Sequence, residues 1–426
     1  MSLISRFDGK KELTPFWCLL LLTGLNLFNY LDRYVLSAVL TPLKDELSLT
    51  DGQLGRLSTA FMIGYFVSCP FFGYLGDRMK RKWLIAGGVL VWSIATVKTG
   101  FATGFLSLVL ARIFVGLGEA SYATISPSLI SDTFPPKKRN NALTIFYVAI
   151  PVGSALGYIL GGSLAESMGW RSAFLWAGIP GLLFALTLLP FGEPKRGRMD
   201  EKESGTQLAH GALPHWSDVL HLFKIPEFNL ICWGYTAYSF ALGAYAYWGP
   251  SFLHRTHDLS NKDASLFFGG VLVVAGLVGT LLGGFLATSW QKKHASGYAW
   301  MLGISVLLTV PASLIAFWSQ DALTTKVCLA LAMFFAFLPT GPINTLILET
   351  VPSKLRSSAM ALSIFMIHMF GDMWSPEIVG RLTDKWGDIR PAISILPGAF
   401  FVASLFWFTL AIRQHRSGVV VKPRRI

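Results

Sequence analysis

Four ionisable residues lie inside stretches of the sequence that are otherwise almost entirely apolar. Asp32 and Arg33 occupy one such stretch near the N-terminus, and Arg112 and Glu119 occupy another. A buried acid can take up and release a proton, and a buried arginine can neutralise a carboxylate or hold an anionic ligand. Because charge inside an apolar span is costly, these residues indicate a site that handles protons or anions.

The spacing of these residues suggests how they would act together. Arg112 and Glu119 are seven apart, which leaves them about 20° apart on one helical face. We therefore expect Arg112 to neutralise either Asp32 or Glu119, and the other carboxylate to hold a proton more readily. This predicts proton coupling through Asp32, Arg112 and Glu119, in which a neutralised carboxylate releases Arg112 to bind an anionic substrate. A static ion-pair network is the alternative. Arg33 faces about 100° away from Asp32, so it either binds substrate or fixes its helix to a neighbour.

His368 and Asp372 form a second candidate pair. Four residues apart on a helix, they lie on the same face, and histidine titrates near neutral pH. The pair is predicted to be a proton-responsive element or gate in the substrate pathway, or else a hydrogen-bonded packing pair. The following Ser375 and Pro376 predict a local break or kink.

The elements that must position these residues are membrane-spanning helices. Of 426 residues, 53% are hydrophobic and 14% charged, whereas a soluble protein carries roughly 25% charged residues. The apolar residues fall in long blocks that can each cross a ~30 Å hydrocarbon core. The sequence therefore predicts an all-α integral membrane protein rather than a soluble one. The expected twelve helices cover 15–40, 52–76, 83–103, 105–131, 140–165, 171–191, 227–252, 264–289, 297–318, 324–349, 355–381 and 391–413. The first is read as a retained span, because its apolar run is too long for a signal peptide.

The polar segments give the domain organisation and the topology. A polar stretch divides the chain into an N-terminal six-helix bundle (1–192), a cytoplasmic linker (193–226) and a C-terminal bundle with its tail (227–426). The formal charge of +12 comes from basic residues concentrated in alternate loops. This asymmetry places both termini in the cytoplasm and needs no nucleic acid to explain it.

An internal repeat relates the two halves. Residues 73–82, which follow the second expected helix, resemble 284–293, and 128–143 align without a gap with 345–360. Such a pattern predicts two six-helix pseudo-repeats in the same orientation.

The loop Gly73-Tyr-Leu-Gly-Asp-Arg-Met-Lys-Arg-Lys82 resembles the G-x-L-x-D-R-x-x-R-[RK] motif of the major facilitator superfamily. The resemblance implies the major facilitator fold and a gating latch formed by Gly73, Asp77, Arg78 and Arg81, with Asp77 and Arg78 as its central groups. Ordinary positive-inside charges are the alternative, but they do not account for Gly73 and Asp77.

A narrower resemblance is carried by four segments, Asn29–Tyr34, Gly116–Tyr122, Phe146–Tyr158 and His368–Pro376. Together they are similar to the spinster family. That resemblance implies a secondary transporter of lysophospholipids or sphingoid phosphates, with proton coupling proposed for some members. We expect this transporter to be a monomer that works by alternating access. The short N-terminus and compact tail look bacterial, which implies a multi-pass protein of the inner (plasma) membrane.

Two further groups of residues bear on packing and on the cargo. Gly153, Gly157, Gly161 and Gly162 have the small-xxx-small spacing that permits close helix approach. They also resemble an antiporter motif, except that Tyr158 replaces its proline. An amphipath needs an apolar wall beside a few polar donors, and Tyr122, Tyr147 and Tyr245 are the tyrosines assigned to substrate binding.

The expected partners are an amphipathic lipid-like substrate, protons and membrane lipids. No cofactor or metal is expected, because the four cysteines lie singly without ligand spacing and no Walker motif is present. Two other functions remain open, namely a proton-coupled transporter of a small organic anion or drug, and a lipid scramblase-like protein. An enzyme is not expected, since the sequence offers no nucleophile or metal cluster.

Overall fold

The computed structural model describes residues 14–188, 190, 192–194, 199, 221–351 and 355–417. These residues belong to two compact units. Unit 1 comprises Met1–Leu49, Arg56–Gly211 and Leu259–Gly269, and unit 2 comprises Thr50–Gly55, Ala212–Asp258 and Gly270–Ile426. The predicted N-terminal lead, most of the 193–226 linker and the C-terminal tail lie outside the described residues, so the predicted domain boundaries stay a prediction.

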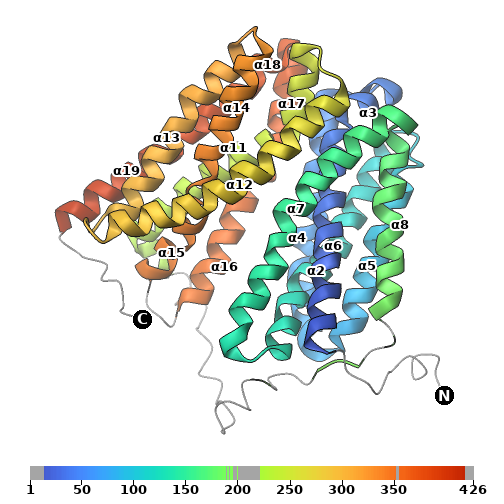
Figure 1. The fold of residues 1–426 in the computed structure, drawn as a ribbon, viewed down its shortest axis with the longest axis horizontal. Coiled ribbons are helices and arrows are strands. Elements are labelled where there is room, and N and C mark those ends of the chain that lie inside the picture. The colour runs from blue at the N-terminus through green and yellow to red at the C-terminus, as the bar shows by residue number, and fades with distance from the viewer. Residues whose placement is uncertain are drawn as a thin grey trace. The chain divides into compact units, whose positions relative to one another are not determined.

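Unit 1 contains the first seven described helices, apart from the first residues of one of them. They are α2 (Pro15–Ala38), α3 (Leu40–Leu47), α4 (Asp51–Arg78), α5 (Arg81–Thr99), α6 (Phe105–Thr133), α7 (Pro136–Met168) and α8 (Trp170–Leu188). The first residues of α4 belong to unit 2. Within unit 1, α2 packs along α7, and α5 packs against both α6 and α8 (Figure 1).

Glycines bring α2 and α7 into close contact. A Cβ atom at Gly153 would lie 2.4 Å from the Leu27 carbonyl oxygen, and one at Gly157 would lie 2.5 Å from that of Leu31. Any larger residue would force the helices apart. The predicted close packing is therefore confirmed, and it fixes the part of α2 that carries Asp32 and Arg33.

Helix α6 is held in the same way. A Cβ atom at Gly64 of α4 would lie 2.2 Å from the Ile113 carbonyl oxygen, and one at Gly116 of α6 would lie 2.2 Å from that of Phe61. On the other side, a Cβ atom at Gly88 of α5 would lie 2.7 Å from the Gly118 carbonyl oxygen. The backbone around Glu119 is thus clamped between α4 and α5.

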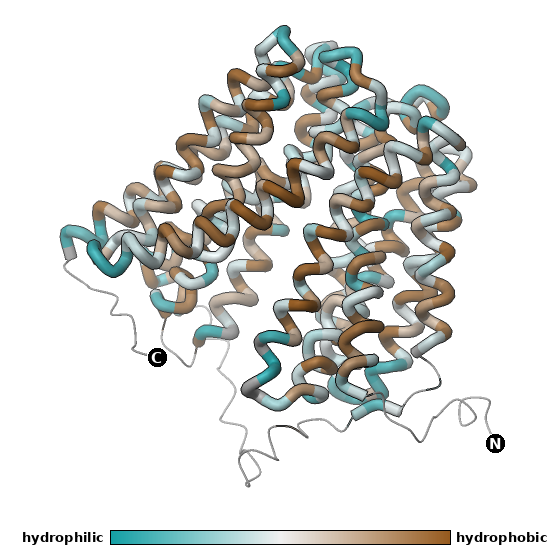
Figure 2. The backbone as a smooth tube through the Cα atoms, viewed as in Figure 1, coloured by the Kyte–Doolittle hydropathy of each residue, from teal (hydrophilic) through white to brown (hydrophobic). Residues whose placement is uncertain are grey.

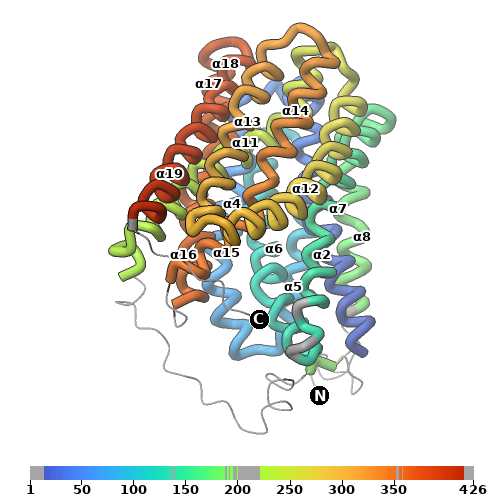
Figure 3. The backbone as a smooth tube through the Cα atoms, turned by 60° about the vertical axis from the view of Figure 1, so that its left-hand side comes forward, coloured from blue at the N-terminus to red at the C-terminus, as the bar shows by residue number. Residues whose placement is uncertain are grey.

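Unit 2 contains the remaining helices. They are η1 (Leu222–Lys224), α11 (Pro226–His257), α12 (Asn261–Gln291), α13 (Gly297–Trp318), α14 (Ala322–Phe337), α15 (Thr340–Thr350), α16 (Arg356–Ile367), the π-helical η3 (His368–Asp372), α17 (Ser375–Trp386), α18 (Ile389–Ile393) and α19 (Ile395–Ser417). The first residues of α12 belong to unit 1. Helix α13 packs against both α14 and α19 (Figure 3).

Three of the twelve predicted stretches are each divided, and in one of them, 391–413, only the first three residues fall in α18 before α19 begins. Residues 324–349 form α14 and α15, which are separated at Leu338 and Pro339. Residues 355–381 are divided into α16, η3 and most of α17, and Pro376 stands in the first turn of α17. Proline lacks the amide hydrogen that a continuous helix would use. The break predicted at Ser375-Pro376 is confirmed.

The described helices have the character of membrane spans. Seven helical stretches among the described residues are long and apolar enough to cross a bilayer: 51–78, 105–133, 141–168, 261–291, 297–318, 322–350 (α14 with α15) and 389–416 (α18 with α19). Hydrophobic residues run along the helices, and hydrophilic ones gather at their ends (Figure 2). Large apolar side chains such as Val67 and Leu281 are mostly exposed, as expected where a helix faces lipid rather than water.

Candidate functional site

An ion pair joins α2 to α6 in the interior of unit 1. Arg33 Nη2 donates to Glu119 Oε2 over 2.8 Å, and the side chains are 25% and 0% exposed respectively. Of the two roles left open for Arg33, the structure supports the one that fixes its helix to a neighbour. The helical spacing predicts Arg112 as the arginine that neutralises Glu119 or Asp32, and it does not predict the ion pair between Arg33 and Glu119.

Asp32 lies in the same cluster but has a different partner. Its carboxylate is buried and accepts a hydrogen bond from the hydroxyl of Thr96 on α5. Glu119, Arg112 and Arg33 all act electrostatically on it. Thr96 was not predicted, because a lone threonine in an apolar helix carries no sequence signal. Asp32, Arg112 and Glu119, which were predicted to act together, are within electrostatic reach of one another, and Arg33, which was expected to face away from Asp32, joins them through its ion pair with Glu119.

Aromatic rings surround the two arginines. The guanidinium carbons of Arg33 and Arg112 lie 4.7 Å and 4.9 Å from the centre of the Phe61 ring. The Tyr30 and Tyr65 rings lie 5.1 Å and 5.5 Å from the Arg33 guanidinium. Cations at this distance from a ring are stabilised by its negative face. We call these three rings, Tyr30, Phe61 and Tyr65, the aromatic cage. The aromatic cage stabilises two positive charges that lie close together, and the sequence did not predict a role for any of the three rings.

The cluster also has hydrogen-bonding capacity left over. Among the described residues, Asp32 Oδ1, Glu119 Oε1 and Arg33 Nε are buried and have no hydrogen-bond partner. Buried polar atoms are usually paired, so each exception calls for an explanation. The charges of the two carboxylates and the two guanidinium groups cancel. Each carboxylate nevertheless keeps one oxygen that could bind a proton or accept a hydrogen bond.

The three predicted substrate tyrosines differ in position. Tyr122 is fully buried in unit 1, where its hydroxyl donates to the Leu22 carbonyl oxygen. Tyr245 is buried in unit 2, and its hydroxyl lies 3.5 Å from the Ser313 hydroxyl. In these positions both hydroxyls link neighbouring helices, and the predicted role of either tyrosine in substrate binding stays a prediction. Tyr147 on α7 is 47% exposed, and its expected role stays a prediction.

His368 and Asp372 lie together at the break between α16 and α17. The His368 Nδ1 atom is 2.9 Å from both carboxylate oxygens of Asp372, as their spacing predicted. The residues form a π-helical turn, a geometry that often occurs at functional sites. A Cβ atom at Gly243 of α11 would lie 2.5 Å from the Asp372 Cβ atom, so this turn is packed tightly against α11.

The motif residues 73–82 form the end of α4 and the start of α5, and the buried ion pairs there are made by Arg81, the first residue of α5. Its Nη1 donates to Asp132 Oδ2 over 2.6 Å, and its Nε donates to Glu193 Oε1 over 2.7 Å. Asp77 and Arg78 are exposed, and the Arg78 guanidinium lies 3.6 Å from the centre of the Tyr74 ring. The prediction gave the central latch role to Asp77 and Arg78, whereas in unit 1 Arg81 makes the buried link to α6. A Cβ atom at Gly73 would lie 3.8 Å from the side chain of Thr124, an ordinary van der Waals distance, so the packing there does not require a glycine.

Comparison with known sequences gives the family. The model of the Major Facilitator Superfamily matches residues 22–376. Protein spinster of Drosophila melanogaster is 33% identical over 371 residues, which are 84% of this chain and 60% of the fly protein. Protein spinster homolog 1 of Xenopus laevis is 33% identical over 393 residues, or 88% of this chain and 74% of the frog protein. A protein of Arabidopsis thaliana named "Probable sphingolipid transporter spinster homolog 1" is 29% identical over 439 residues, covering 93% and 89% of the two chains.

Solved structures give the same fold. An inward-facing, unoccupied bacterial homolog of the human lysosomal transporter Spinster superposes with a TM-score of 0.86 at 24% identity, covering 95% of this chain and 98% of that one. A D-xylose–proton symporter superposes with a TM-score of 0.73 at 19% identity, covering 93% and 97%. The architecture is the twelve-helix major facilitator fold. This chain therefore belongs to the spinster family of the major facilitator superfamily, a family of multi-pass membrane transporters.

Proposed function

We propose that the protein is a secondary active transporter that moves a lysophospholipid- or sphingoid-phosphate-like amphipath by alternating access, together with protons. The observation that carries the proposal is the buried cluster of Asp32, Arg33, Arg112 and Glu119, in which each acid keeps one unpartnered oxygen. The names of the plant relatives refer to sphingolipids, which supports a lipid cargo.

Charge balance links the cargo to the proton. The cluster contains two carboxylates and two guanidinium groups, so an anionic headgroup would add uncompensated negative charge to a buried place. Such charge is expensive unless it is paired. A proton on Glu119 would offset it and would also free Arg33 to donate to the headgroup as a charge-assisted partner. A zwitterionic headgroup brings no net charge and needs no proton by this argument.

The remaining residues have supporting roles in the proposal. Arg112 holds the second positive charge beside Asp32, and the exposed ring of Tyr147 offers an apolar surface to the acyl chain. In unit 2, the His368–Asp372 pair acts as a second proton-responsive element. Arg81, rather than Arg78, is the main latch of the motif loop. The transporter acts as a monomer in a bacterial inner membrane with both termini in the cytoplasm, as the loop charges favour.

The test is transport into proteoliposomes with a pH-sensitive dye inside. A sphingoid phosphate, a zwitterionic lysophosphatidylcholine, a sugar and a dicarboxylate are offered with and without an imposed pH gradient. Glu119→Gln and Asp32→Asn are compared with Glu227→Gln, which removes a carboxylate that pairs with Arg413 in unit 2. We expect the gradient to accelerate the sphingoid phosphate most, and this effect to disappear in the two cluster variants only.

Two results would reject the proposal. If both cluster variants fold and remain fully proton-dependent, the cluster does not couple transport to protons. If the dicarboxylate is transported and neither lipid is, the protein is instead a transporter of small organic anions. Lipid flux that neither saturates nor responds to pH would identify a scramblase.

A further inference from the structure

A cavity of about 630 Å³ opens in unit 2, lined by residues of α12, α13, α14 and the segments that follow α12 and α14. Every lining residue belongs to unit 2, so the cavity is built without the Asp32 cluster of unit 1. It lies at the end of the bundle where α12 ends and α13 begins. We refer to it as the α12–α14 groove.

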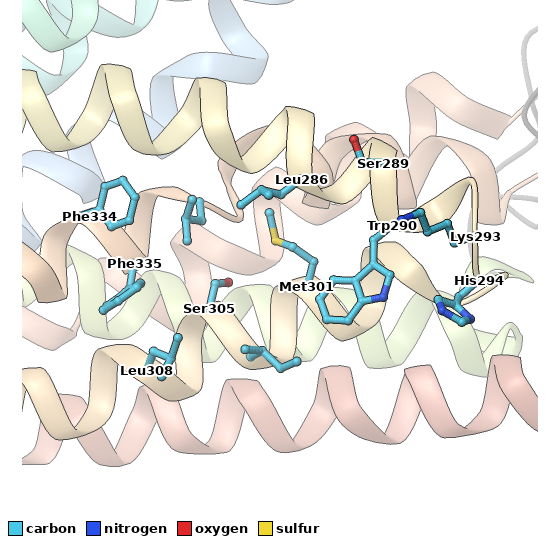
Figure 4. Close-up of a pocket in the computed structure, with 12 residues that line it drawn as sticks. Leu286, Ser289, Trp290, Lys293, His294, Met301, Ser305, Leu308, Phe334 and Phe335 are labelled. Atoms are coloured by element: carbon cyan, nitrogen blue, oxygen red, sulfur yellow. The ribbon is translucent and has the colours of Figure 1, made fainter.

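The two ends of the α12–α14 groove differ in character (Figure 4). Phe334, Phe335 and Leu308 form an apolar end, whereas Lys293 and His294 lie at the other end. Both of these basic residues are exposed and stand in the short connection between α12 and α13. The groove is therefore amphipathic along its length, as a site for a lipid must be.

The dimensions suit one acyl chain of one leaflet. Along α13 the lining runs from Met301 to Leu308, and the seven steps between these two residues span about 10 Å at the rise of an α-helix. One leaflet contributes about 15 Å to a ~30 Å hydrocarbon core. Leu286 and Leu308 on the rim are 46% and 43% exposed, so the groove is open at its side and a chain can enter from the bilayer.

The polar end is suited to an anionic headgroup. Trp290 lies beside the two basic residues (Figure 4), and tryptophan is typical of the membrane–water interface. Within the described part of the chain, no ion pair includes Lys293 or His294, so no carboxylate of the described residues competes with a lipid phosphate for them. A lysine near a membrane surface favours anionic lipid by about five-fold.

We propose that the α12–α14 groove binds one acyl chain of an anionic diacyl phospholipid from the surrounding membrane, with the lipid phosphate held by Lys293 and His294. The bound lipid is a fixed companion of unit 2 rather than cargo. Its site is separate from the buried acids and does not depend on the proposed transport function.

A photoreactive lipid tests the assignment. The full-length protein is placed in phosphatidylcholine nanodiscs that contain a trace of phosphatidylglycerol with a diazirine in its acyl chain, and labelled peptides are mapped by mass spectrometry. We expect labels at the groove residues of α12, α13 and α14, and less labelling by a matched phosphatidylcholine probe. Lys293→Ala should reduce labelling about five-fold, and Leu308→Trp should reduce it by filling the open side.

The matched control is Lys292→Ala. This neighbour is also exposed and carries the same charge, but it does not line the groove, so its loss should leave labelling unchanged. Equal losses in the two lysine variants would mean diffuse surface attraction and would overturn the proposal. Equal labelling by the two probes would also overturn it, and so would displacement by an equimolar single-chain lysolipid, which would make the groove part of a cargo route. The lysine variants change exposed side chains, so they keep the test valid even if Leu308→Trp does not fold.

Discussion

Removing Arg33 should destabilise the protein in a way that depends on pH. Glu119 is fully buried and its Oε2 lies 2.8 Å from Arg33 Nη2. Breaking a buried ion pair by deleting one partner costs about 3–5 kcal/mol, because the other charge is left uncompensated. In Arg33→Ala, Glu119 can escape that cost by binding a proton. An ordinary glutamate releases its proton near pH 4.3, and keeping that proton costs about 1.4 kcal/mol for each pH unit above this value. Protonation of Glu119 therefore limits the loss in free energy of unfolding to about 3.7 kcal/mol at pH 7.

The sign of the pH dependence follows from proton binding. In the variant, folded Glu119 carries a proton that the unfolded chain releases above about pH 4.3, so stability falls as pH rises. The deficit of Arg33→Ala relative to wild type should shrink to about 1 kcal/mol at pH 5. The neutral Glu119→Gln variant removes the acid, so adding Arg33→Ala to it should cost much less than Arg33→Ala alone. A coupling energy of about 2 kcal/mol is expected from this double-mutant cycle.

The measurement is unfolding in mixed detergent micelles, followed by tryptophan fluorescence at pH 5 and pH 7 for all four members of the cycle. The same cycle on Arg413 and Glu227 is the control, because their side chains are 51% and 29% exposed and such pairs contribute about 0–1 kcal/mol. Additive losses at the Arg33–Glu119 pair, or a deficit that does not change between pH 5 and pH 7, would refute the reasoning.

Three further outcomes are expected from single substitutions. Gly153→Ala should cost about 1–3 kcal/mol by overpacking α2 against α7, whereas Gly87→Ala, with open space around its Cβ, should be neutral or slightly stabilising in the same unfolding assay. Arg81→Ala should cost about 3–5 kcal/mol through two lost buried ion pairs, whereas the exposed Arg78→Ala should stay within about 0.5 kcal/mol. His368→Gln should flatten the pH profile of transport near neutral pH, and a profile unchanged from wild type would mean that the pair only packs.

The helices were predicted well because their signals are local. Each expected span is a long apolar block, and length with composition is enough to identify a membrane helix. The break before Pro376 was predicted from the same kind of local rule. The break at Leu338 and Pro339 was not, although Pro339 stands there in an apolar run, because the surrounding hydrophobicity continues on both sides of it.

The ionisable residues of the cluster were predicted, but the ion pair between Arg33 and Glu119 was not. A charge in an apolar span is visible in the sequence, which is why Arg33 and Glu119 were both selected. A helical wheel gives the direction of a side chain on its own helix, but not which neighbouring helix that direction meets. The uncharged partners were missed for a different reason: Thr96 and Phe61 look like any other residue of a membrane helix. By contrast, His368 and Asp372 lie one turn apart on one helix, so their contact needed no tertiary information.

The packing around the cluster bears on how proton coupling would operate within unit 1. Glycine contacts clamp α6 near Glu119 and hold α2 against α7, so the backbones there have little room to move independently. Protonation of Glu119 would then act first on side chains, by removing the main electrostatic partner of Arg33. The Phe61, Tyr30 and Tyr65 rings already lie within 5.5 Å of its guanidinium and would stabilise the cation in the absence of the carboxylate. The aromatic cage therefore lowers the cost of releasing Arg33 to a headgroup, which a cluster held by ion pairs alone would not do.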